Sequence, residues 1–131
     1  MIIRTLAIVW MLLTAIVMLI GGGYFSKGGP KKINRFVGYR TRMAMKNQDT
    51  WEFAHKYCGK IWLRAGLIML ALTAIPVTFL LARENIDLRM VISVSVATVF
   101  LQGMALLISI IPTEVALRKN FDKDGNSKID K

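Results

Sequence analysis

Two side chains of this sequence stand close enough together to be considered as ligands of one metal ion. His55 is its single histidine, and Cys58, its single cysteine, follows three residues later. On a helix this spacing can bring two ligands to a metal, but zinc sites in proteins use three or four protein ligands. We therefore expect His55 to be a polar residue at a membrane interface, with no metal bound. One cysteine also excludes a disulfide within the chain.

Residues 121–131 resemble the beginning of a calcium-binding EF-hand loop. Oxygen donors occupy the first, third, fifth and ninth places of that pattern, at Asp122, Asp124, Asn126 and Asp130. The resemblance then fails, because Ser127 stands where the turn needs glycine, Lys128 adds a positive charge, and the glutamate of the twelfth place is missing. We expect a solvated turn here rather than a calcium site.

Catalytic groups are absent from the apolar parts of the sequence. The three long apolar runs contain no Asp, Glu, His or Lys that could relay a proton, and no nucleophile stands beside a base. We therefore expect neither an enzyme nor a proton pump, and no cofactor.

Apolar and charged residues are separated along the chain. Hydrophobic residues make up 54% of it, although the net charge is +10. Three runs are apolar on all sides, at about residues 5–25, 65–82 and 90–111, and each approaches the roughly 20 residues that cross a bilayer as a helix. A cleaved signal peptide is disfavoured for the first run, because lysines and no Ala-x-Ala site follow it. We predict an all-α integral membrane protein, a single domain over residues 1–131 with three transmembrane helices.

The basic residues predict how these helices are oriented. The loop 26–64 carries ten Lys and Arg residues and the tail 112–131 carries five, whereas the other side has only Arg4, Arg83 and Arg89. Because positively charged loops stay in the cytoplasm, we expect the loop and the tail to be cytoplasmic and the N-terminus to be outside. The protein would then be a multi-pass protein of the cell membrane.

An amphipathic pattern precedes the second apolar run. Asp49 and Glu52 form a pattern similar to a capping box, and a helix is expected after them. One face of that helix is apolar: Trp51, Ala54, Tyr57, Cys58, Ile61, Trp62 and Ala65. The opposite face is charged: Glu52, Lys56, Lys60 and Arg64. We predict an interfacial amphipathic helix with its aromatic residues at the headgroups, and Gly59 and Gly66 would permit a bend. Two roles remain open: anchoring the loop to the membrane, or presenting residues 34–41 as a binding surface.

Polar and small residues recur along one face of the third apolar run. They are Ser95, Thr98, Gln102, Ala105 and Ser109, at helical spacing. Such a stripe commonly packs against other helices, and the alternative is a permeation path. In the second run, Pro76 is expected to kink the helix. After the third run, residues 112–120 predict a short helix that leaves along the membrane surface, with Glu114 and Arg118 paired one turn apart.

The first loop and the helix predicted after it contain a recognisable sequence motif. The segment Asn34-Arg35-Phe36-Val37-Gly38-Tyr39-Arg40-Thr41 is followed by Lys46, by Trp51 with Ala54, and by Gly59-Lys60. This arrangement resembles the signature loop of the SdpI-like family, small bacterial membrane proteins named for immunity to a secreted sporulation-delaying toxin peptide. Many members have proline after the Arg-Thr pair, where this chain has Arg42, so the turn there is less rigid than in those members. The resemblance implies that the signature positions bind a ligand or partner: Asn34, Gly38, Arg40, Thr41, Trp51 and Gly59.

The resemblance also implies a function. It predicts an inner-membrane protein that binds an antimicrobial or toxin peptide for immunity or signalling. A subunit of a small oligomeric transporter or channel is the alternative, because several copies could enclose a path that one copy cannot. Expected partners are anionic lipid headgroups at the basic loop, a toxin peptide, a cytoplasmic regulator and a second copy of the chain, but no nucleic acid.

Overall fold

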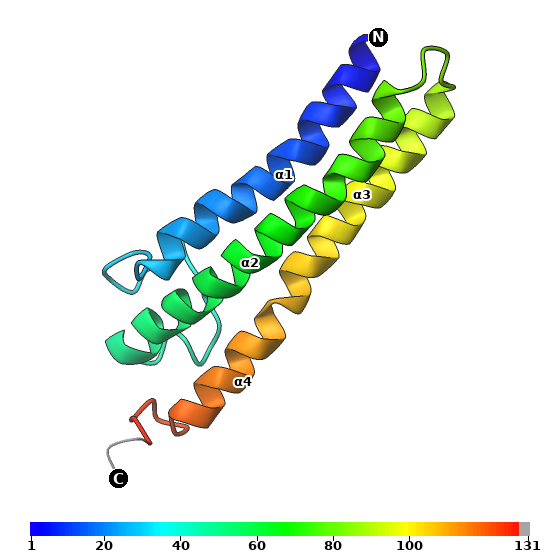
Figure 1. Cartoon of the computed structure of the whole chain (residues 1–131). Helices are drawn as coiled ribbons and strands as arrows, with labels where there is room; N and C mark the ends of the chain where they lie inside the picture. The colour runs from blue at the N-terminus through cyan, green and yellow to red at the C-terminus, as the bar shows by residue number, and fades with distance from the viewer. Residues whose placement is uncertain (129–131) are drawn as a thin grey trace.

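The computed structural model describes residues 1–128 and places four α-helices in them, with no strand. The helices are α1 (Ile2–Ser26), α2 (Gln48–Leu81), α3 (Leu88–Ile108) and α4 (Ile110–Asn120). α1, α2 and α3 lie side by side (Figure 1), with the N-terminus and the α2–α3 turn at one end of the bundle and the long α1–α2 loop at the other. Three helices are long and apolar enough to cross a membrane: α1, α2, and α3 together with α4. The prediction of an all-α protein with three transmembrane helices is confirmed.

α2 contains both the predicted amphipathic helix and the second span in one continuous helix of 34 residues. Its N-cap is Asn47, two residues before the predicted cap at Asp49. Asn47 accepts a hydrogen bond from the amide of Thr50 (2.9 Å), and the Thr50 hydroxyl accepts one from the amide of Asn47 (3.1 Å). The predicted cap at Asp49 is therefore wrong, because this reciprocal pair satisfies the first free amides of the helix. Asp49 lies inside the first turn, where its charge favours the helix N-terminus.

Glycines bring α1 and α2 into close contact. A β-carbon on Gly22 would lie 2.7 Å from the amide nitrogen of Leu63, and one on Gly59 would lie 2.6 Å from the carbonyl carbon of Phe25. Both neighbours are backbone atoms, so any side chain at these positions would push the two helices apart.

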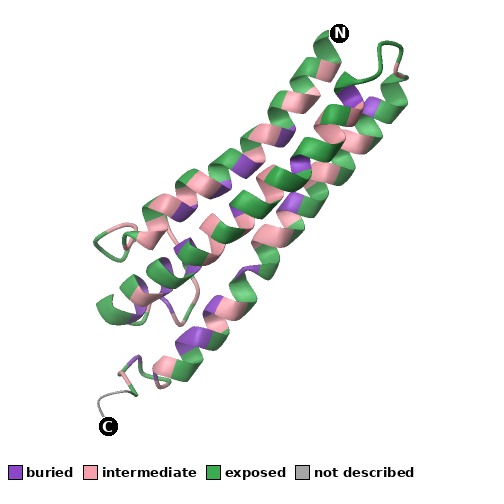
Figure 2. Cartoon of the chain, viewed as in Figure 1, coloured by how far each residue is buried: buried purple, intermediate pink, exposed green. Residues whose placement is uncertain are grey.

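Most side chains on the outer surface of the three spans are apolar and exposed. Leu67, Ile75 and Phe100 are each exposed by 59% or more, and the buried positions in Figure 2 face the inside of the bundle. A water-soluble protein rarely exposes apolar surface on this scale, whereas lipid covers it at no cost.

Gln102 lies at the centre of the bundle and joins all three spans. Its side-chain nitrogen donates hydrogen bonds to the carbonyl of Met11 (3.1 Å) and to the hydroxyl of Thr73 (2.9 Å), and its oxygen accepts one from Thr14. Burial without these partners would cost several kcal/mol in lipid, so this contact sets the relative height of the helices.

α4 does not follow the predicted course along the membrane surface. It continues in the general direction of α3 (Figure 1), after a break at Ser109 that precedes Pro112. Thr113, Ala116 and Leu117 are buried on it, because this face packs against the first half of α2. The predicted pairing of Glu114 with Arg118 is also wrong, since Glu114 accepts a hydrogen bond from the Tyr39 hydroxyl (3.0 Å) instead.

Candidate functional site

The loop between α1 and α2 folds over the first turns of α2 and forms, with α4 and the tail, a structured head outside the apolar spans. Its hydrophobic core consists of Tyr39, Ala44, Ala54, Cys58, Leu117 and Phe121. Protein rather than lipid therefore covers much of the apolar face of the predicted amphipathic helix. Trp51, expected among the headgroups, is fully buried, while Tyr57 remains 38% exposed. The periodicity identified the buried face correctly, but the covering side chains come from distant parts of the chain.

His55 holds the loop against α2. Its Nδ1 lies 2.7 Å from the carbonyl oxygen of Trp51, and its Nε2 accepts a hydrogen bond from the amide of Tyr39 (2.9 Å). A carbonyl can only accept, so the proton is on Nδ1 and the ring is neutral. Burial also lowers the pKa of His55. The side chain is fully buried, so its prediction as an interfacial polar residue is wrong.

Two glycines with positive φ enclose the His55 ring. A β-carbon on Gly29 (φ 63°) would lie 2.5 Å from Cδ2 of His55, and a β-carbon on Gly38 (φ 123°) would overlap its Nε2. Both positions thus need glycine for backbone conformation and for space. Both ring nitrogens of His55 are engaged, so neither is free to bind a metal. Within residues 1–128, no three or more His, Cys, Asp or Glu residues form a group that could hold a metal ion.

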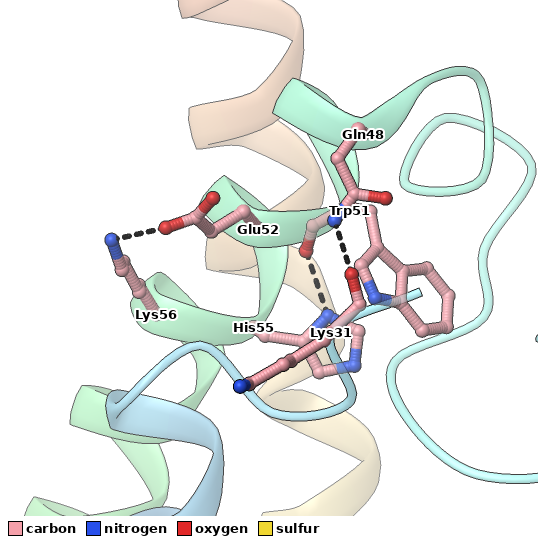
Figure 3. Close-up of polar contacts among 6 residues, drawn as sticks. All are labelled: Lys31, Gln48, Trp51, Glu52, His55 and Lys56. Carbon is pink, nitrogen blue, oxygen red and sulfur yellow. Dashed lines mark hydrogen bonds and ion pairs between the residues drawn. The ribbon is translucent and has the colours of Figure 1, made fainter. Parts of the chain in front are cut away.

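Trp51 and Gln48 hold the opening of the loop (Figure 3). The indole nitrogen of Trp51 donates to the carbonyl of Pro30 (2.7 Å). Its ring lies beside that of His55, with the centroids 4.3 Å apart. Gln48 donates to the carbonyl of Lys31 (2.7 Å). The backbone carbonyls of Pro30 and Lys31 thereby gain hydrogen-bond partners on α2. The first turn of α2 therefore holds this part of the loop in position.

The structure does not bring the six signature positions together in one place. Gly38 and Trp51 meet at His55, whereas Gly59 lies at the contact of α1 with α2. Asn34 shapes the tip of the loop, where its side-chain oxygen accepts hydrogen bonds from the amides of Phe36 (3.0 Å) and Val37 (2.8 Å). All four are engaged in packing or in hydrogen bonds to the backbone.

The other two signature positions lie further along the loop. Thr41 accepts a hydrogen bond from the amide of Ala44 (3.3 Å). Arg40 is exposed and donates to the carbonyl of Arg35. Phe36, at the tip, is 88% exposed. Among the signature residues, Arg40 is thus the one whose charged group is open to a ligand. The sequence indicated residues 34–41 as a possible binding surface, but which of these side chains are exposed depends on how the loop folds.

Burial also changes the acidity of two groups in the core of the head. It raises the pKa of the Tyr39 hydroxyl, and the neighbouring Glu114 carboxylate adds to this effect. Burial raises the pKa of the Cys58 thiol to about 11. The thiol therefore stays protonated at neutral pH and behaves as a packing group rather than a nucleophile.

The polar stripe of α3 is used in two ways. Gln102 and Ser109 reach other helices: Ser109 accepts a hydrogen bond from the indole of Trp62 (2.9 Å). Ser95 and Thr98 donate instead to carbonyls one turn earlier on α3. Their hydroxyls are thereby satisfied within the helix, which leaves Gln102 as the polar centre of the spans.

The tail folds into a turn of its own. The carboxylate of Asp122 accepts hydrogen bonds from the amides of Asp124 and Asn126 (both 2.9 Å), and these bonds lower the pKa of Asp122. Asp130, the ninth place of the EF-hand pattern, lies outside the described residues. Among the pattern's oxygen donors within residues 1–128, both carboxylate oxygens of Asp122 are engaged within the turn itself.

An apolar groove runs between α2 and α3 on the outer surface of the spans. Its volume is about 830 Å³. Pro76 lines it on α2 and Ala97 and Ala105 line it on α3, with Thr73 and Gln102 among its few polar residues. Small residues at this depth allow another helix to approach closely.

Comparisons with known proteins agree with the resemblance of the loop. The model of the SdpI/YfhL protein family matches residues 31–114, which is more than half of the chain. The protein YfhL of Bacillus subtilis (strain 168) is 36% identical over 58 residues, covering 39% of this chain and 53% of that protein, so the chain spans about half the length of this relative. No solved structure matches the chain. The match includes the loop from residue 31 onward, the whole of α2 and α3 and the start of α4. The chain is a multi-pass membrane protein that belongs to the SdpI/YfhL family.

Proposed function

We propose that this protein binds an amphipathic toxin peptide within the bilayer and thereby confers immunity or signals the presence of the peptide. Family membership supports a protein similar to SdpI, and the observation that carries the proposal is the apolar groove between α2 and α3. The protein performs no catalytic step in this proposal, and it needs neither a cofactor nor a nucleic acid.

The groove suits an apolar helix better than a polar ligand. Recognition by a groove places the apolar face of an amphipathic helix against a complementary surface. In lipid there is no hydrophobic gain on contact, so close packing has to supply the affinity. Ala97 and Ala105 provide room for it, and their substitution by a large residue would fill the groove without removing a hydrogen bond.

Filling the groove tests the proposal. We expect Ala105→Phe to abolish protection of a toxin-sensitive host against a co-encoded or related peptide, and to abolish crosslinking of that peptide to the protein. Ala74→Phe is the matched control, because Ala74 is exposed and lies on α2 outside the groove. Protection that survives Ala105→Phe at normal expression would remove the groove from the proposal. An unmodified chain that protects against none of the peptides would refute immunity.

We also propose that the head is cytoplasmic and that the N-terminus is outside. The distribution of Lys and Arg supports this orientation. In a Cys58→Ala background, we expect a cysteine at Asn85 to react with a membrane-impermeant maleimide in intact cells and a cysteine at Lys119 to react only after lysis. Both parent side chains are exposed. The reverse pattern would place the head outside, where a cytoplasmic regulator could not reach it.

An oligomeric transporter or channel subunit is the second candidate, and the buried polar side chain of Gln102 is the observation in its favour. Its donors and acceptor are engaged between helices, which favours packing over conduction. Ion or solute flux into liposomes that contain the protein would support the transporter, provided that Gln102→Leu changes that flux.

A further inference from the structure

A second cavity, on the head, is positively charged. We call it the basic groove; its volume is about 430 Å³. Three separate segments form it: the end of the α1–α2 loop, α4 and the tail. Its lining residues are Arg42, Met43, Lys46, Glu114, Arg118, Phe121, Asp122, Lys123 and Lys128. Five of these side chains are cationic and two are acidic.

The two carboxylates offset only part of this charge, because five cations against two anions leave a net charge of +3 on the lining. Glu114 accepts its hydrogen bond from Tyr39, and Asp122 accepts from backbone amides of its own turn. Within residues 1–128, the one ion pair joins Lys56 to Glu52, outside the groove. The Lys128 ammonium donates to the backbone carbonyl of Arg118. A carbonyl group is neutral, so this hydrogen bond does not offset the charge of Lys128. The positive charge in the groove is therefore available to a ligand.

The tail is held in place as one wall of this groove. The side chain of Asn47 donates to the carbonyl of Gly125 (2.7 Å), and the Phe121 ring meets the Phe53 ring edge to face with centroids 5.3 Å apart. Gly125 has a φ of 89°, and a β-carbon there would lie 2.7 Å from Asn47. These contacts bring Lys123 and Lys128 towards the cations of the loop despite their mutual repulsion, which an anion between them would relieve.

We propose that the basic groove binds a phosphate-bearing anion. Arg42 and Arg118 offer planar forks of donors that match phosphate oxygens, and the lysines add charge without fixed geometry. Met43 and Phe121 form an apolar part of the lining, beside which the organic part of a phosphate ester can pack. The basic groove is separate from the apolar groove between α2 and α3, so this proposal does not depend on peptide binding.

Two sources can supply the phosphate. Arg118 lies seven residues after the end of the third apolar run, about 10 Å at 1.5 Å per residue. This height is within reach of lipid headgroups and is also open to soluble phosphate compounds. The chemistry of recognition is the same in both cases, so the experiment has one arm for each source.

The experiment measures binding to the full chain in nanodiscs. In phosphatidylcholine nanodiscs, pyrophosphate is titrated by calorimetry; in a second arm, a fluorescent phosphatidylglycerol is titrated into the same discs and energy transfer from the protein is followed. We expect saturable binding in at least one arm. Binding of pyrophosphate would assign a soluble source, and binding of phosphatidylglycerol alone would assign the lipid.

Paired variants separate the groove from general positive charge. Arg42→Gln with Arg118→Gln should weaken saturable binding at least tenfold. Arg35→Gln with Lys119→Gln removes the same charge from exposed positions outside the groove and should change binding less than twofold. Equal weakening by both pairs, no binding in either arm, or equally tight binding of polyglutamate would overturn the proposal. Unchanged tryptophan fluorescence in both pairs establishes that the head is folded.

Discussion

Replacing His55 by phenylalanine tests whether the histidine holds the loop. The substitution keeps an aromatic ring between Gly29 and Gly38 but removes the acceptor for the amide of Tyr39. That amide is buried and would then have no partner. Trp51 loses less, because its carbonyl still accepts the backbone hydrogen bond of α2.

The expected size of the effect follows from this one lost acceptor. A buried amide without a partner destabilises a protein by about 1 to 3 kcal/mol. We therefore expect His55→Phe to lower the free energy of unfolding of the head by about 2 kcal/mol at pH 7.5. Tyr57→Phe is the matched control on the same helix, since the Tyr57 ring is 38% exposed, and we expect a change below about 0.5 kcal/mol.

Protonation provides an independent test of the same contact. The ring touches Phe25, Gly29, Gly38 and Trp51, none of which carries a charge. The pKa of His55 is lower in the folded head than its usual 6.5, so as pH falls the unfolded chain binds the proton first. Stability is therefore full above pH 6.5 and decreases below it, by up to about 1.4 kcal/mol per pH unit, until the folded pKa is reached.

The assay is urea unfolding in mild-detergent micelles, followed by tryptophan fluorescence. A Trp10→Phe background leaves Trp51 and Trp62, both in or beside the head. The wild-type midpoint should decrease between pH 7.5 and 5.5, while the midpoint of His55→Phe should stay nearly constant. Equal midpoints for wild type and His55→Phe at pH 7.5, together with a wild-type midpoint that ignores pH, would refute the assigned role of the histidine.

Three further substitutions have expected outcomes. Gly59→Ala should destabilise the α1–α2 contact by about 3 kcal/mol, measured as loss of folded protein on titration with a denaturing detergent, because the methyl group meets backbone; Gly103→Ala, with nothing within 4 Å, is its control and should have little effect. Gln102→Leu should cost about 1 to 2 kcal/mol in the same titration, since hydrogen bonds between helices in membranes contribute about this much, and a stabilised variant would contradict its role. Trp51→Phe should cost about 1.5 kcal/mol in urea through the lost bond to Pro30, and faster proteolysis of the loop should accompany it.

Much of the fold could be predicted from the sequence because its signals are local. The three apolar runs are long enough to span a bilayer, and their helices are found where they were expected. The apolar face at Trp51, Ala54 and Cys58 was likewise identified by helical spacing, and these residues are buried. The loop motif indicated the family, which the match over residues 31–114 confirms.

Tertiary structure alone decided what covers that face and how the head is assembled. Periodicity shows that a face is buried but does not identify what covers it. Trp51 was therefore expected among the lipid headgroups, although Pro30 and the loop enclose it. The role of His55 depends on the amide of Tyr39, sixteen residues earlier. The basic groove joins Arg42 to Arg118 and the tail. Contacts between such distant residues depend on packing the whole chain, and for this reason the sequence determined the spans whereas the folded structure determined the candidate sites.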